Sequence, residues 1–194
     1  MTATVAASSP DLTPVNTITD AGHVYWITGL SGAGKTTTAQ LLAVRLRTER
    51  RLVIVLDGDE LRTVYGDGLA FTLDDRRVLA MRNARLCRLL SSQGFDVICA
   101  TISLFHECHR WCRANIANYH EVFLRVSLDE LQRRDSRSLY RGKTSHVAGV
   151  DLAVEAPLHP DVLVDNDGGM TPEAVVSQVW RALFPRKGSV TDAG

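Results

Sequence analysis

The residues with the most recognisable chemistry lie in one short glycine-rich stretch, Gly29 to Thr36. Its sequence, Gly-Leu-Ser-Gly-Ala-Gly-Lys-Thr, fits the pattern G-x-x-x-x-G-K-[ST], in which backbone N–H groups enclose a polyphosphate. In this pattern the lysine, Lys35, reaches the β- and γ-phosphates, and the threonine hydroxyl, Thr36, binds Mg²⁺. The stretch therefore predicts a site for ATP and Mg²⁺, made by Gly29, Ser31, Gly32, Ala33, Gly34, Lys35, Thr36 and Thr37.

A second group of polar residues, Asp57-Gly58-Asp59 with Arg62, follows an apolar run. Two carboxylates at the mouth of a nucleotide site can divide the work of phosphoryl transfer. We expect Asp57 to hold Mg²⁺ together with Thr36, and Asp59 to accept the proton of an attacking hydroxyl. Capping of a helix is the structural alternative for Asp59, and it does not exclude catalysis.

A third polar stretch lies between residues 133 and 143 and is strongly basic. A lid that closes over phosphates has this character, because closure must neutralise charge and exclude water. The alternative is a solvated basic loop. We predict a mobile lid at about residues 134–158, with the basic residues Arg134, Arg137, Arg141 and Lys143.

Strand-like and helix-like runs alternate along the chain, which predicts a parallel sheet with helices on both faces. The fold class we expect is α/β, a P-loop NTPase of the nucleotide-kinase type with five parallel strands. The predicted strands are Val24–Thr28, Leu52–Leu56, Phe95–Ala100, Glu121–Val126 and Asp161–Val164. The predicted helices are Lys35–Glu49, Asp74–Gln93, Glu107–Asn118, Leu128–Arg134 and Pro172–Leu183. Ligands of such sheets bind at the carboxyl ends of the strands, where all three polar stretches fall.

The length of 194 residues suits one domain, predicted at 23–184, between flexible segments at 1–22 and 185–194. The 22 basic and 22 acidic residues balance, so charge gives no reason to expect nucleic acid or a membrane as partner. We expect a cytoplasmic protein without disulfides. Cys108 and Cys112 could share a helix face and bind zinc, but no second ligand pair has the usual spacing.

Together these residues resemble the adenylylsulfate (APS) kinase family. The shared segments occur in the family's order over roughly residues 24 to 184. They are Gly29–Thr36, Leu56–Asp59 with Arg62, Phe71-Thr72, Asp75-Arg76, Ile102-Ser103, Arg134-Asp135, Leu139-Tyr140, Gly149–Asp151 and Glu155–Pro157.

The resemblance implies transfer of the ATP γ-phosphate to the ribose 3′-hydroxyl of APS, with Lys35 and Asp59 as catalytic residues. It also implies that Arg62, Phe71, Arg76, Ile102 and Ser103 line the acceptor site, with Phe71 stacked on the base of the acceptor. Many members of the family are dimers, so a homodimer is possible.

Several acceptor-side positions differ from the family pattern, among them Leu104 in the place of a proline. Leu79 occupies the place of a polar asparagine, His106 that of an arginine, and Val147 that of a second aromatic residue. A segment from Ser103 to Phe123 resembles a divergent branch that includes the cytidine diphosphoramidate kinases. We therefore expect a kinase for APS or an APS-like nucleotide. The alternatives are a CDP-linked phosphoramidate as acceptor and, from another class, an ATP-binding regulator without an acceptor.

Overall fold

The computed structural model describes residues 20–66, 72–134 and 154–185. Five parallel strands form one sheet, as predicted, and their order in the sheet is β2-β3-β1-β4-β5. Every residue of the central β1 and β3 is buried, which agrees with their apolar sequences. The strands are β1 (Val24–Thr28), β2 (Val53–Asp57), β3 (Asp96–Ala100), β4 (Tyr119–Arg125) and β5 (Val162–Asp165).

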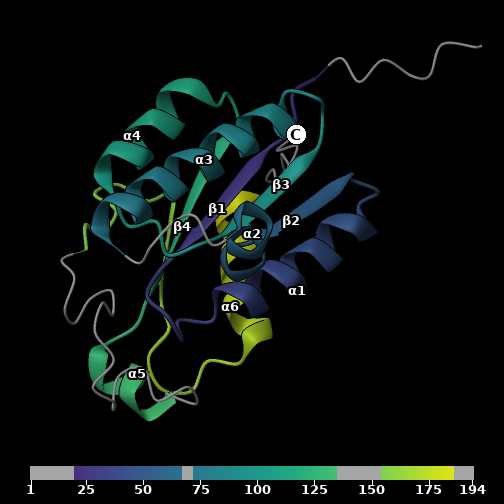
Figure 1. Ribbon diagram of the computed structural model, residues 1–194. Helices are drawn as coiled ribbons and strands as arrows, with labels where there is room; N and C mark the ends of the chain where they lie inside the picture. Colours follow the sequence, from purple (N-terminus) through teal and green to yellow (C-terminus); the bar gives the residue numbers. More distant parts are fainter. Residues whose placement is uncertain (1–19, 67–71, 135–153, 186–194) are drawn as a thin grey trace, which may run out of the picture.

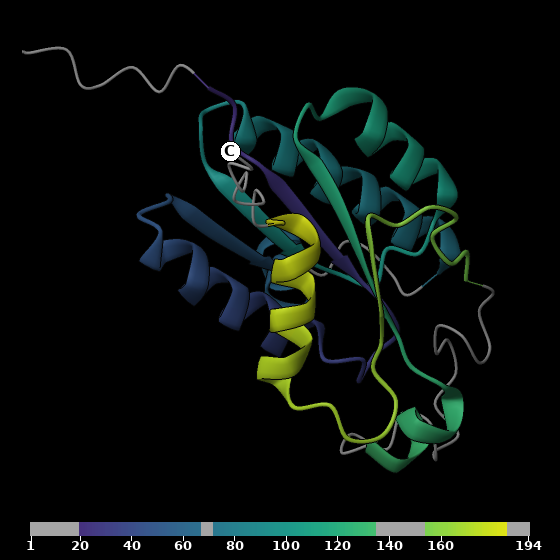
Figure 2. The same cartoon turned by 180° about the vertical axis from the view of Figure 1, so that it is seen from behind.

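Helices cover both faces of this sheet and enclose two apolar cores (Figures 1 and 2). The first core lies under α1 and α6 and contains Leu42, Leu46 and Val179. The second lies under α3 and α4 and contains Trp26 and all four cysteines, Cys87, Cys99, Cys108 and Cys112, which are free thiols. The helices are α1 (Lys35–Thr48), α2 (Gly58–Tyr65), α3 (Leu73–Ser91), α4 (His106–Asn115), α5 (Leu128–Arg134) and α6 (Pro172–Leu183).

The sequence analysis missed one element, the short helix α2. Its only buried residue is Leu61, so it carries no apolar stripe that a periodicity argument could detect. The helix begins at Gly58 because the side chain of Asp57 accepts a hydrogen bond from the backbone N–H of Asp59 at 2.9 Å. Asp57 is thus the N-cap residue, and the alternative role of Asp59 as a cap was wrong. The other predicted elements are present, with ends that differ by up to three residues.

Several predictions fall outside the described residues. These concern Phe71, Arg137, Arg141, Lys143, Val147 and most of both terminal segments. Within the described ranges, no helix has the length and apolar character needed to cross a membrane. The same ranges contain no cluster of three His, Cys, Asp or Glu side chains that could hold a metal ion, and the thiol of Cys108 contacts the carbonyl of Ala80 at 3.6 Å instead.

Two histidines meet at the amino-terminal edge of the sheet. The rings of His23 and His120 stack with centroids 5.2 Å apart, and Nδ1 of His23 lies 2.9 Å from Nε2 of His120. Burial lowers the pKa of both imidazoles, and the guanidinium of Arg51 lowers them further, although Asp96 and Asp161 act in the opposite direction. The pair is therefore stable as neutral rings.

This pair should make the protein less stable in mild acid. Since the folded-state pKa values lie below 6.5, the unfolded chain binds more protons as the pH falls through that value. Solvent screens these half-exposed rings, so we expect the free energy of unfolding to decrease by less than about 1 kcal/mol between pH 7.5 and 5.5. Urea denaturation at the two pH values measures the change.

His120→Gln should lose less stability over this pH interval than the wild type. His159→Gln, a change of an exposed histidine outside the pair, should show the wild-type dependence. Equal pH dependence for His120→Gln and the wild type would contradict the assignment.

Candidate active site

The loop from Gly29 to Thr36, here called the phosphate loop, connects β1 to α1 in a conformation that depends on its glycines. Gly34 has φ of 91° and precedes the first residue of α1, a left-handed geometry that glycine adopts without strain. Gly29 has φ of 150°, and a Cβ atom there would lie 2.5 Å from the carbonyl oxygen of Leu124. The loop can therefore lie close against β4 and direct its backbone toward a ligand.

The side chain of Lys35 folds back over the phosphate loop. Its Nζ donates to the carbonyl of Leu30 at 2.8 Å. Burial of the ammonium group lowers the pKa of Lys35 to about 8, and the nearby carboxylates of Asp59 and Asp57 partly oppose this effect. A polyphosphate in contact with this ammonium would favour its charged form.

Asp57 connects the phosphate loop to α2. Its Oδ2 accepts a hydrogen bond from the hydroxyl of Thr36 at 2.6 Å, while its Oδ1 caps α2. The two predicted Mg²⁺ ligands are thus adjacent, and both offer the hard oxygen donors that Mg²⁺ prefers. One carboxylate and one hydroxyl suit an ion whose remaining positions are filled by substrate phosphates and water.

Asn166 supports the phosphate loop from the opposite side, and the sequence analysis missed it. This residue follows β5 and is 6% exposed. Its side-chain Nδ2 donates to the carbonyl of Ala33 at 3.1 Å. Its backbone carbonyl accepts a hydrogen bond from the guanidinium of Arg134 at 2.6 Å. Its place after the last strand, at the carboxyl edge of the sheet, was the available signal.

Arg134, predicted as a lid residue, is the last residue of α5 and is held there by Glu130 at 2.6 Å. The final part of the predicted lid range is also anchored, because the backbone N–H of Glu155 donates to the carbonyl of Leu104 at 3.1 Å. The proposed lid motion therefore concerns a segment between these two attachment points, which lies outside the described residues.

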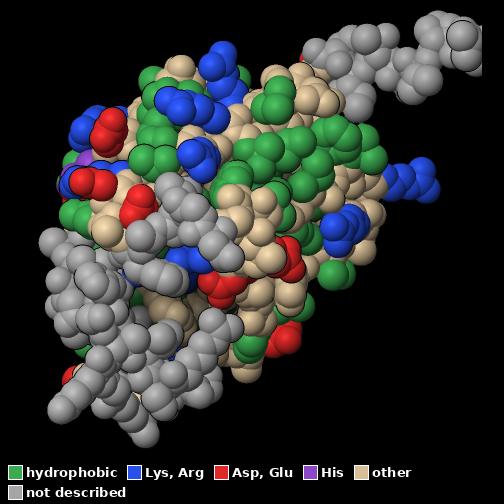
Figure 3. Space-filling model, in the orientation of Figure 1, with side chains coloured by type: hydrophobic (Ala, Val, Ile, Leu, Met, Phe, Trp, Pro, Cys, Tyr) green, Lys and Arg blue, Asp and Glu red, His purple; other side chains and the backbone are tan. Residues whose placement is uncertain are grey.

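A cavity of about 440 Å³ extends from the phosphate loop to α3. Acidic and basic side chains lie next to one another beside a hollow on this face (Figure 3). Most of the described residues predicted for the site line the cavity, namely Ser31, Gly32, Gly34, Lys35, Thr36, Thr37, Asp57, Asp59, Arg62, Arg76, Leu79, Ile102, Ser103 and Arg134. Gly29, Ala33 and His106 are not part of its lining. The lining also includes residues that the sequence analysis did not select, among them Leu61, Tyr65, Leu73, Asn83, Phe105, Leu131 and Val154.

Two of the arginines that line the cavity belong to helices α2 and α3. Arg62 projects from α2 and Arg76 from α3. Burial lowers the pKa of Arg76, and the positive charge of Arg62 lowers it further. Their positive charges repel one another, and a phosphate, a sulfate or a similar anion in this part of the cavity would reduce that repulsion.

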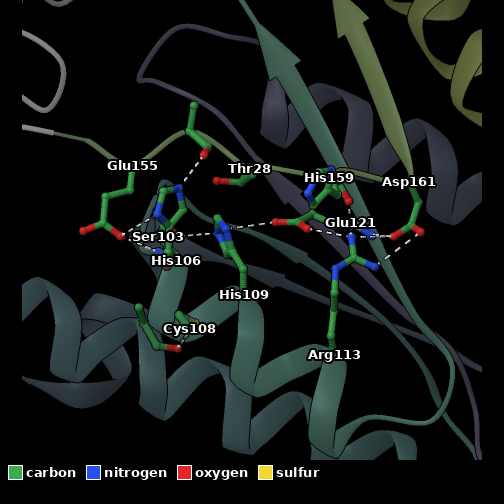
Figure 4. A network of polar contacts seen from close by, with 12 residues as sticks. Thr28, Ser103, His106, Cys108, His109, Arg113, Glu121, Glu155, His159 and Asp161 are labelled. Atoms are coloured by element: carbon green, nitrogen blue, oxygen red, sulfur yellow. Dashed lines mark hydrogen bonds and ion pairs between the residues drawn. The ribbon is translucent and has the colours of Figure 1, made fainter.

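The loop after β3 forms one wall of the cavity and is held by polar contacts on several sides (Figure 4). Ser103 has a positive φ of 21°, which is unusual for a residue with a side chain. Its hydroxyl accepts from Thr101 at 2.7 Å, and its carbonyl lies 2.9 Å from Nε2 of His109. The carbonyl of Ile102 accepts from the hydroxyl of Thr28. These contacts fix the cavity wall to β1 and α4.

The contacts of this loop continue into a buried charge network (Figure 4). Nδ1 of His109 lies 3.0 Å from Oε1 of Glu121, and Oε2 of Glu121 accepts from Arg113 at 2.8 Å. Arg113 also contacts Asp161 at 3.2 Å. Since Glu121 is only 2% exposed, its charge depends on these partners. The network joins the cavity wall to the segment that leads into β5.

His106, predicted as a substrate contact, joins α4 to the final part of the predicted lid range. Its Nε2 lies 2.8 Å from the carbonyl of Ala156, and its backbone N–H donates to the carboxylate of Glu155. The ring is outside the cavity lining, so we now interpret His106 as a structural contact of the acceptor wall.

Comparison with known proteins finds relatives that are kinases. Residues 21–165 match the family model for adenylylsulphate kinase. A cytidine diphosphoramidate kinase of Campylobacter jejuni is 35% identical over 165 residues, which cover 83% of this chain and 96% of that protein. An adenylyl-sulfate kinase of Paraburkholderia xenovorans is 40% identical over 151 residues, which cover 75% and 84% of the two chains.

A solved structure shows the same architecture. The Mycobacterium tuberculosis APS kinase CysC, in complex with AMPPNP and APS, has a TM-score of 0.77 and 30% identity, with 84% of this chain and 98% of that chain covered. The phosphate loop, the parallel sheet and the sequence match agree, and the chain belongs to the adenylylsulphate kinase family of phosphotransferases.

Proposed function

We propose that the protein transfers the γ-phosphate of ATP to a ribose hydroxyl of a nucleotide, either APS or an APS-like activated nucleotide. The observation that supports this proposal is that residues of the phosphate loop line the same cavity as Arg62 and Arg76. Asp59 also lines this cavity. A regulator that only binds ATP would not need an anion site beyond the phosphate loop.

The chain's own residues divide the reaction between them. Lys35 and the backbone of the phosphate loop bind the ATP phosphates, and Thr36 and Asp57 would hold Mg²⁺, which neutralises charge on the transferred group. Asp59 accepts the proton as the acceptor hydroxyl attacks phosphorus. A new P–O bond forms to the acceptor, the bond to the leaving oxygen breaks, and ADP departs.

The identity of the acceptor nucleotide rests on the other half of the cavity. Leu79 lines it with an apolar side chain, while His106 lies outside it. Both features weaken a purely APS-directed site, because neither residue offers the acceptor a charged or hydrogen-bonding contact there. The similarity to a cytidine diphosphoramidate kinase over 96% of that protein supports a CDP-linked phosphoramidate as the second candidate.

Asp59→Asn should lower kcat by about 100-fold or more and change the KM for ATP much less. Asparagine keeps the size of the side chain but cannot accept the proton, and Asp57 still caps α2. Steady-state kinetics with saturating acceptor measure both constants.

Glu60→Gln is the matched control for Asp59→Asn. It removes the neighbouring carboxylate, which is exposed in the same first turn of α2, and it should leave kcat nearly unchanged. If Asp59→Asn changed only the KM for ATP, Asp59 would be a binding residue and not the base.

A panel of acceptors tests the function itself. We expect ADP release from Mg²⁺-ATP to be stimulated by APS, by a CDP-linked phosphoramidate, or by both, and less by a UDP-linked nucleotide. Slow ADP release that no acceptor stimulates would favour the regulator. A preference for APS of several orders of magnitude would show that Leu79 does not redirect the site.

A further inference from the structure

One face of α3 points toward the acceptor half of the cavity. Leu73, Arg76, Leu79 and Asn83 all line it, at spacings of three, three and four residues that keep side chains on one side of a helix. Arg76 is the charged member of this face, and Leu79 is apolar. Asn83 lies one helical turn beyond Leu79 and was not selected from the sequence.

Asn83 is deeply buried but incompletely bonded. Its side chain is 5% exposed, and its Oδ1 has no hydrogen-bond partner in the described part of the chain. Seven other residues in these ranges carry a buried polar atom without a hydrogen bond, and none of the seven lines the cavity. By contrast, the buried hydroxyl of Ser91, two turns further along α3, donates to the carbonyl of Arg88 at 3.2 Å.

A buried oxygen without a partner destabilises a folded protein, and most such atoms in proteins are paired. The cost is recovered when a ligand supplies the missing donor. From this burial and its place in the cavity, we propose that Asn83 is a specificity-determining residue that accepts a hydrogen bond from the nucleotide acceptor. The proposal rests on the proposed function, because it assumes that the acceptor occupies this half of the cavity.

The missing partner must be an N–H or O–H group. Oxygens of a sulfate or an ionised phosphate can only accept, and the arginines on the same side already suit such anions. The group of the acceptor nucleotide that faces Asn83 is therefore a hydrogen-bond donor, an amine or a hydroxyl. Ribose hydroxyls are common to both candidate acceptors, and the two donors that can be removed separately are the amino group of the nucleobase and the nitrogen of a phosphoramidate.

Asn83→Leu is the central experiment, because leucine has a similar volume and makes no hydrogen bond. Isothermal titration calorimetry should show acceptor affinity 10- to 100-fold weaker than in the wild type, since one buried hydrogen bond is lost. Affinity for Mg²⁺-ATP should be unchanged. The melting temperature should be equal or higher, because an unpaired buried oxygen has been removed.

Asn83→Asp tests the direction of the hydrogen bond. Aspartate keeps acceptor oxygens, so it should bind the acceptor more tightly than Asn83→Leu does. Ser91→Ala is the matched control, a buried polar position on the same helix outside the cavity, and it should bind the acceptor as the wild type does. Acceptor affinity within twofold of the wild type in Asn83→Leu would overturn the proposal.

Paired ligands identify the source of the donor. APS is compared with its analogue lacking the base amino group, and a CDP-linked phosphoramidate is compared with the corresponding CDP-linked phosphate. The ligand that lacks the relevant donor should bind wild type and Asn83→Leu equally. If acceptors bind but no phosphate is transferred, the proposed function fails. The ratio of acceptor affinities of the wild type and Asn83→Leu still decides the role of Asn83. If no nucleotide of the panel binds the wild type, both proposals fail.

Discussion

The carboxylate of Asp57 is the contact on which the geometry of the site depends. One oxygen accepts a hydrogen bond from the hydroxyl of Thr36 in the phosphate loop, and the other accepts one from the backbone N–H of Asp59, the second residue of α2. A single side chain at the end of β2 therefore sets the position of the ATP half and of the helix that carries Asp59 and Arg62. Its pairing in both directions fixes the phosphate loop and α2 relative to one another through one side chain.

The opposite wall is built differently, from contacts distant in sequence. Ser103 keeps its unusual backbone angle because His109, on α4, and Thr101 hold it, and His109 in turn depends on the buried carboxylate of Glu121. Such a charge is tolerated only while its partners remain in place. The described wall of the cavity is thus tied to α4 and β4 by contacts between residues far apart in the sequence.

Local patterns were enough to predict much of this arrangement. The phosphate loop and the alternation of strands and helices depend on neighbouring residues, so the sequence contains them. The helix α2 was missed because one buried leucine makes no periodic signal. Asn166 and Asn83 were missed because their roles come from contacts with Ala33 and with a cavity, and only the folded chain brings these together. His106 was expected at the acceptor site from the family resemblance, and its contact with the carbonyl of Ala156, 50 residues away, could not be read from the sequence.

The cavity concentrates polar groups that burial makes costly. The pKa of Lys35 is lowered to about 8 and that of Arg76 is also lowered, both mainly by burial. An anion bound at either end would raise these pKa values again, because it favours the charged forms. By linkage, each anion is then bound more tightly when both cations are fully protonated. The same desolvation that lowers the stability of the free protein would therefore strengthen its interaction with an anion beside Lys35 or beside Arg76.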